Sequence, residues 1–153
     1  MARKKTMPGS SHFSTKEISF NFIDRSPTIG SRKSIREWLE QMLTQEGARF
    51  YSINYNFCSD KFLFKMNKKY LNHSFNTDII TFDLGDGNME GDIYISIDRV
   101  KENSKSLRVT FRDELSRVMI HGLLHLCGYK DKTKAQQKQM RSKEDYYLSL
   151  RQF

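Results

Sequence analysis

The sequence predicts a single α/β domain in which helices pack on a small, mixed, four-stranded sheet, with a metal site on a core helix. Three observations support this prediction. Strand-like and helix-like apolar periods follow one another, the 153 residues suffice for one core, and no internal repeat breaks the order. We expect the domain to span residues 16–153. Residues 1–15 are basic without the apolar stretch of a secretory signal, and we expect them to form a disordered tail.

The first half of the domain is predicted to alternate strand, helix, strand and helix, over residues 17–24, 31–47, 49–59 and 59–72. In the first strand, Ile18, Phe20 and Phe22 alternate with polar residues, which is the period of a half-buried strand. The first helix has apolar residues at helical spacing and ends at Gly47. The second helix begins at Ser59, a residue type that caps helix N-termini.

The second half is predicted to continue with two strands and three helices, over residues 77–84, 91–98, 98–106, 110–128 and 134–150. The segment between the two strands is rich in glycine and asparagine, which predicts a hairpin. Thr110 and Asp113 resemble a helix-capping box, with aspartate in place of the usual glutamate. Gly128 is placed to end the same helix in a left-handed conformation.

The chain is basic, with a net charge of +8. Removing the three basic residues of the predicted tail lowers this value from +8 to +5. A positive field attracts polyanions, and nucleic acid is the commonest of them. The charge alone leaves two alternatives open, a nucleic-acid-binding surface and a lysine-rich surface that only keeps the protein soluble.

The two cysteines, Cys58 and Cys127, lie far apart in a chain without an export signal. We therefore expect free, buried thiols and a reducing, cytoplasmic location. Cys127 could also bind a metal, although it lies two positions after His125 and so on a different helical face. No apolar run approaches the roughly 20 residues of a membrane span, so no membrane association is expected.

The segment HGLLHLCGYKD, residues 121–131, contains the candidate catalytic and metal-binding residues. His121 and His125 are one helical turn apart and about 40° from each other around the helix axis, so both rings point the same way. The turn at Gly128 reverses the chain, which lets Asp131 face the two rings. Two imidazoles and one carboxylate leave a fourth position open for water, as in catalytic zinc sites. We therefore predict one Zn²⁺ ion bound by His121, His125 and Asp131.

Each part of this pattern also has a structural explanation. A histidine pair beside an apolar stripe can consist of hydrogen-bonded core residues, and an aspartate between Lys130 and Lys132 can be a surface charge. The glycine and the aspartate at these spacings favour the metal site.

Gly122 separates this pattern from that of the zinc peptidases. In the peptidase motif H-E-x-x-H, the glutamate after the first histidine accepts a proton from zinc-bound water. Glycine cannot act as a base, and inside a helix it costs on the order of 1 kcal/mol relative to alanine. It therefore indicates tight packing or a substrate lying close to the backbone, and no protein general base is assigned.

The same segment, together with TDIITF at 77–82 and GDIYIS at 91–96, resembles the YbeY family of bacterial metal-dependent endoribonucleases, the rRNA maturation factors. The family pattern is H-G-x-L-H-L-x-G-Y-x-H/D. It is matched by His121, Gly122, Leu124, His125, Leu126, Gly128 and Tyr129. The resemblance extends from Ile18 to Leu150.

Two positions depart from the pattern of most family members. Most members have a third histidine where this chain has Asp131, and a carboxylate oxygen is also an acceptable zinc ligand. Many members carry an arginine in the loop before the T-D-x-[IVL] strand, whereas residues 72–77, NHSFNT, contain none. His73 in this loop is a further candidate to face the metal.

The resemblance implies a zinc-dependent, single-strand-specific endoribonuclease in 16S rRNA 3′-end maturation, ribosome assembly and quality control. It implies precursor rRNA and the small ribosomal subunit with its proteins as partners. His121 and His125 would then be catalytic through zinc-bound water, whose pKa of about 7 reduces the need for a protein base. Two alternatives stay open, an assembly factor with a structural zinc and a metal hydrolase of another substrate.

A basic run follows the predicted metal site and could hold the RNA backbone. The candidate contacts are Lys130, Lys132, Lys138 and Arg141. A solvated, lysine-rich helix face is the structural alternative.

Overall fold

The computed structural model describes residues 16–72 and 77–153, and its central feature is a four-stranded sheet in the order β1-β2-β4-β3. β1 (Glu17–Phe22), β2 (Phe50–Cys58) and β4 (Met89–Ser96) are parallel to one another. β3 (Ile79–Asp83) runs antiparallel to β4 at one edge, which completes the predicted hairpin. The predicted α/β domain with a mixed four-stranded sheet is confirmed. The predicted tail, residues 1–15, lies outside the described residues.

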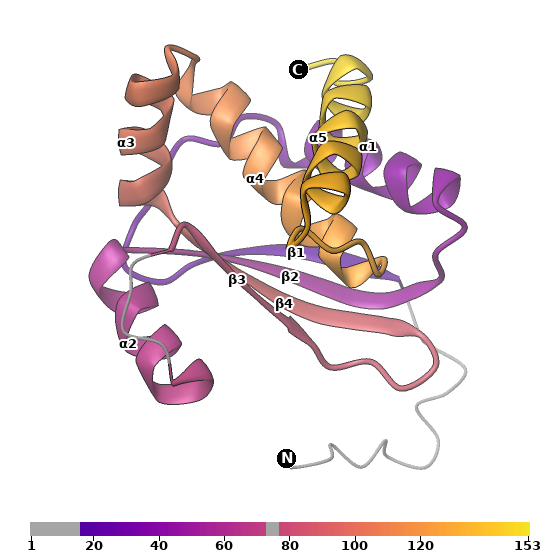
Figure 1. Cartoon of the computed structure of the whole chain (residues 1–153), viewed down its shortest axis with the longest axis horizontal. Coiled ribbons are helices and arrows are strands. Elements are labelled where there is room, and N and C mark those ends of the chain that lie inside the picture. The colour runs from indigo at the N-terminus through magenta and orange to yellow at the C-terminus, as the bar shows by residue number, and fades with distance from the viewer. Residues whose placement is uncertain (1–15, 73–76) are drawn as a thin grey trace.

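Helices cover both faces of this sheet (Figure 1). They are α1 (Arg32–Gln45), α2 (Asp60–Leu71), α3 (Ile97–Leu107), α4 (Phe111–Leu126) and α5 (Lys134–Ser149). Figure 1 shows α1, α4 and α5 on one side of the sheet and α2 on the other. Within the described parts of the chain, no helix combines the length and apolarity that crossing a membrane requires.

The element ends differ from the predicted ones by a few residues, and capping explains the clearest case. The strand predicted over 91–98 ends at Ser96, because the Ser96 side chain accepts a hydrogen bond from the backbone N–H of Arg99 at 3.1 Å. Ser96 is therefore the N-cap of α3, and the helix starts one residue earlier than predicted.

Two apolar clusters lie on opposite faces of the sheet. The larger one joins the sheet to α1 and α4, and it includes the fully buried Ile53, Tyr55 and Ile93. Tyr55 also donates a hydrogen bond to the carbonyl oxygen of Met119 at 3.0 Å, which ties β2 to α4. The smaller cluster lies under α2 and is centred on Leu63. The larger cluster holds the helix that carries the two histidines.

Two glycines let α4 lie close to the sheet. A Cβ atom on Gly122 would lie 2.7 Å from Cδ1 of Ile79 and 3.0 Å from Cγ2 of Ile93. A Cβ atom on Gly91 would lie 2.6 Å from Cδ1 of Leu126. Of the two explanations that the sequence leaves for Gly122, tight packing is the one that the fold supports.

Both cysteines have free thiols, as predicted. Cys58 is buried between the sheet and α2. The prediction of burial is wrong for Cys127, which is only half-buried, because it lies at the end of α4 where the chain turns toward the surface.

Candidate metal centre

The helix α4 holds His121 and His125 at the border between the core and the surface. Its first turn is capped by Thr110, whose side chain accepts a hydrogen bond from the backbone N–H of Asp113 at 3.0 Å. Most of its other side chains are buried, so the axial rotation of the helix is fixed by packing. The two histidine side chains remain 24% and 29% exposed, which is enough for an ion and a substrate to reach them.

The turn that follows α4 directs the third group toward the two rings. Gly128 has a φ of 101°, a conformation that favours glycine, and its N–H donates to the carbonyl oxygen of His125 at 3.0 Å. The next residue, Tyr129, accepts a hydrogen bond on its carbonyl oxygen from Nδ1 of His125 at 2.9 Å. The turn therefore orients one histidine ring and also brings Asp131 back toward α4.

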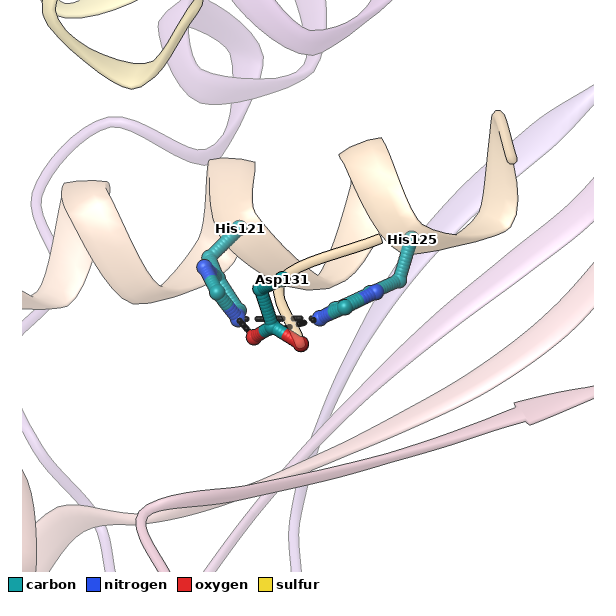
Figure 2. A group of neighbouring side chains, drawn as sticks. All are labelled: His121, His125 and Asp131. Carbon is teal, nitrogen blue, oxygen red and sulfur yellow. Dashed lines mark hydrogen bonds and ion pairs between the residues drawn. The ribbon is translucent and has the colours of Figure 1, made fainter. Parts of the chain in front are cut away.

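The three side chains converge on one point, as Figure 2 shows. Nε2 of His125 lies 3.0 Å from Nε2 of His121, and Oδ2 of Asp131 lies 3.2 Å and 3.3 Å from these two nitrogens. Zinc bonds of about 2.0–2.2 Å in a tetrahedral arrangement separate neighbouring ligand atoms by roughly 3.3 Å. The predicted convergence is confirmed, and the spacing fits a small tetrahedral ion. The role of the three residues as ligands remains a prediction.

The hydrogen bonds behind the rings decide which ring nitrogens carry hydrogen. Nδ1 of His121 faces a carboxylate oxygen of Glu144 at 2.8 Å, and Nδ1 of His125 faces the carbonyl oxygen of Tyr129. Both partners only accept, so each Nδ1 must donate and each neutral ring presents an unprotonated Nε2 to the centre. Two nitrogen lone pairs and a carboxylate oxygen then meet with no hydrogen between them. A cation is the natural partner of such a set.

Glu144 on α5 is the buried carboxylate behind His121. Its side chain is 7% exposed, and it also accepts a hydrogen bond from the guanidinium of Arg117 at 3.0 Å. Burial alone would raise the pKa of Glu144, but the hydrogen bonds from His121 and Arg117 keep it below its ordinary value. Burial alone would lower the pKa of His121, whereas Glu144 and Asp131 raise it above 6.5. A proton and a metal ion therefore compete for the same nitrogen.

A cleft of about 430 Å³ opens beside the three converging side chains. Its lining includes His121 and Asp131, together with Arg141 and Glu144 of α5. Two more carboxyl groups, Asp78 and Glu114, also line it, and burial raises the pKa of both. The cleft lies directly against the candidate metal position.

The four predicted RNA contacts lie on the exposed surface near this cleft. Lys130, Lys132 and Lys138 are exposed, and Arg141 is exposed and lines the cleft. Their role in RNA binding remains a prediction. Lys143, another member of the basic run, is instead held by Glu46, with Nζ at 3.0 Å from the carboxylate.

The structure describes only one of the two other candidate ligands. His73 lies outside the described residues, as does most of the loop that lacks the family's arginine. Cys127 does not belong to the metal-type cluster that the described residues form. Burial also raises the pKa of its thiol to about 12, which disfavours the thiolate that zinc binds.

The roles of Glu144 and Arg117 were not predicted from the sequence. A signal for Glu144 exists, since Met140, Glu144 and Tyr147 are spaced as one face of a helix and all three are buried. An acidic residue on an apolar helix face needs a partner in the interior. A signal for Arg117 exists as well, because it lies one helical turn before His121 and therefore on nearly the same face of α4.

Comparison with known proteins gives consistent results. The family model described as "Endoribonuclease YbeY" matches residues 19–151. The protein named Endoribonuclease YbeY from Cytophaga hutchinsonii is 50% identical over 138 residues, covering 89% of this chain and 96% of that relative. Its namesake from Flavobacterium psychrophilum is 50% identical over 136 residues, covering 87% of this chain and 95% of that relative.

A solved structure shows the same fold. The solution structure of TM1509 from Thermotoga maritima superposes with a TM-score of 0.62 at 28% sequence identity, covering 88% of this chain and 87% of that chain. The resemblance that the motifs indicated is thus confirmed over nearly the whole domain. The chain belongs to the YbeY family of endoribonucleases.

Proposed function

We propose that this chain is a zinc-dependent, single-strand-specific endoribonuclease that acts in the cytoplasm on precursor rRNA. Its role would be in 16S rRNA 3′-end maturation, ribosome assembly and quality control, with the small ribosomal subunit and its proteins as partners. Family membership supports the hydrolysis of RNA. The observation that carries the proposal is the convergence of three hydrogen-bond acceptors beside a cleft.

His121, His125 and Asp131 would hold the ion. Their spacing of 3.0–3.3 Å and their unprotonated inner atoms fit Zn²⁺. When bound, zinc supplies a Lewis acid and lowers the pKa of a coordinated water to about 7. With three protein ligands, an ion held here would keep one coordination position for water.

The chain would bind RNA through the cleft and the exposed cations around it. Arg141 lies on the cleft wall, where its guanidinium can contact a phosphate next to the ion. Lys130, Lys132 and Lys138 extend the positive surface along the turn and α5, where further phosphates would bind. Gly122 supplies no base, since it packs against the sheet, so the His121–His125 pair would act through the ion.

The proposal is tested by measuring metal content and RNA cleavage on the same preparations. We expect about one equivalent of zinc in the wild-type protein, with cleavage of single-stranded RNA and much weaker cleavage of duplex RNA. His125→Ala should lose both zinc and cleavage while keeping its circular dichroism spectrum. Protein that is folded but binds no zinc would contradict the metal site. Equal cleavage by the variant would assign the activity to a contaminant.

A deletion strain separates the enzyme from an assembly factor with a structural zinc. If cleavage is the function, a plasmid encoding His125→Ala should leave the 16S rRNA 3′ end unprocessed, whereas the wild-type gene restores it. If the variant fully restores processing, the protein acts as an assembly factor and not as a nuclease.

A further inference from the structure

The carboxylate of Glu144 is the most deeply buried charged group in contact with the candidate metal centre. Oε2 lies 2.8 Å from Nδ1 of His121, and Oε1 accepts from Arg117 at 3.0 Å. A second guanidinium, that of Arg141, lies 3.6 Å from Oε1. The carboxylate is thus held from two sides and cannot rotate away from the histidine without losing these partners.

The two histidines are oriented by different kinds of acceptor. His125 is oriented by the backbone carbonyl of Tyr129, four residues away in the turn that follows α4. His121 is oriented by a side chain 23 residues away on another helix. A change at position 144 therefore alters the hydrogen bond of one ring only, and the other ring serves as an internal reference.

We propose that Glu144 is a positioning residue for the metal centre: its carboxylate keeps the hydrogen of the neutral His121 ring on Nδ1 and directs the Nε2 lone pair toward the ion. The proposal extends the proposed function, because it rests on the same metal site. Hydrogen-bonded acceptors behind metal-binding histidines typically fix ring orientation and raise ligand basicity. Arg117 in turn keeps Glu144 ionised and in place.

Three variants isolate this hydrogen bond. Glu144→Leu removes the acceptor at similar volume, and Arg117 still pairs with Asp145 at 2.8 Å, so no buried cation is left alone. Glu144→Gln keeps one acceptor oxygen in nearly the same position. Asp145→Asn is the matched control, because Asp145 shares Arg117 but is 60% exposed and outside the hydrogen bonds of His121.

Two measurements test the two parts of the proposal, the tautomer of the His121 ring and the zinc affinity. Long-range ¹H–¹⁵N spectra of the metal-free protein, at a pH where both rings are neutral, show which nitrogen of each ring carries hydrogen. Competition with a chromophoric chelator gives the zinc affinity. We expect Nδ1–H on both rings of the wild type, and loss of this form for His121 alone in Glu144→Leu. Zinc affinity should fall by about 10- to 100-fold in that variant, with partial recovery in Glu144→Gln and wild-type behaviour in Asp145→Asn.

The proposal is overturned if folded Glu144→Leu keeps both the Nδ1–H form of His121 and the wild-type zinc affinity. It is also overturned if Asp145→Asn loses as much affinity, because the effect would then belong to the contact between α4 and α5. Failure of the wild type itself to bind zinc would contradict the proposed function. In that case the spectra of the metal-free protein still decide the role of Glu144.

Discussion

Gly122 lies where a zinc peptidase has its catalytic glutamate, and its surroundings explain why no side chain is present. The residue faces Ile79 and Ile93 of the sheet, and there is no room for a Cβ atom without movement of these side chains. The close approach sets the depth at which α4 lies and therefore the position of the neighbouring His121. The glycine costs the helix about 1 kcal/mol in propensity, which the tighter packing offsets.

A larger residue at this position should destabilise the fold. We expect Gly122→Val to lower the free energy of unfolding in urea by about 1–3 kcal/mol, because the branched side chain overpacks the contact with β3 and β4. The control is Ala135→Val, which places the same side chain on an exposed position of α5. There the loss should stay below about 1 kcal/mol, the difference in helix propensity. If Gly122→Val is as stable as the wild type, the side chains of the sheet can move to make room for valine, and the contact does not require glycine.

Asp131 would give the proposed zinc site a carboxylate ligand beside the two imidazoles. A carboxylate and two neutral imidazoles would give a bound Zn²⁺ ion a net charge of +1, lower than three histidines would give. The Asp131 side chain is 40% exposed, so solvent reaches the candidate metal centre from its side. This lower charge would still favour contact with a phosphate oxygen.

At the scale of elements, Glu46 connects the end of α1 to the turn that carries Asp131. Its side chain is 8% exposed and accepts hydrogen bonds from the hydroxyl groups of Tyr129, at 2.7 Å, and Tyr147. Lys143 completes the set as an ion pair. Because Tyr129 also orients His125 through its carbonyl oxygen, this cluster holds the turn that follows α4.

The protonation of Glu46 should therefore affect stability. Burial alone would raise the pKa of Glu46, but hydrogen bonds from Tyr129, Tyr147 and Lys143 hold it below the ordinary value of 4.5. A folded-state pKa below the unfolded one stabilises the fold above pH 4.5, and this contribution is lost as the pH falls through the folded-state pKa. Acidification should thus weaken the link between α1 and the turn.

We expect Glu46→Gln to lower the free energy of unfolding at neutral pH by about 1.5–3 kcal/mol, the range for hydrogen bonds to a charged group. The difference from the wild type should shrink as the pH falls below 4.5. Denaturant unfolding at a series of pH values measures both effects. Glu37→Gln, an exposed glutamate on the same helix, should change stability by less than about 0.5 kcal/mol at any pH. A pH-independent difference for Glu46→Gln would contradict the role of its charge.

At the scale of the whole molecule, the positive charge has a defined place relative to the cleft. The net charge is +8, and the turn after α4 and the start of α5 expose several of the cations next to the candidate metal centre. Other exposed lysines lie on α2, which covers the opposite face of the sheet (Figure 1). Variants in these two groups of exposed cations can therefore distinguish a local binding surface from an effect of the total charge.

Reversing the charge of Lys138 and Arg141 should weaken the binding of single-stranded RNA and reduce its salt dependence. Each lost phosphate contact lowers the slope of log K against log salt by about 0.7 for a single strand, so we expect a change of roughly 1.4. Lys65→Glu with Lys68→Glu makes the same change in net charge on α2. Titrations at several salt concentrations should show little change for this control. Equal effects of the two double variants would mean that only the total charge matters.

The sequence alone determined the order of the elements and the three converging groups of the candidate site. These features depend on neighbours a few residues apart: the period of 3.6 sets the two imidazoles on one face, and a glycine turn reverses the chain within six residues. Local geometry of this kind is the same in any fold that accommodates the helix. The family resemblance assigned an expected reaction, metal-dependent hydrolysis of RNA, to the same residues.

Only the tertiary structure decided what surrounds these groups. Glu144 meets His121 across 23 residues, Glu46 meets Tyr147 across 101, and Gly122 meets two strands whose distance from α4 no local pattern encodes. Such contacts depend on how whole elements pack, and packing is set by the summed burial of many apolar side chains rather than by spacing along the chain. The ring tautomers, the buried carboxylate and the cleft could therefore be assigned only after the helices were placed on the sheet.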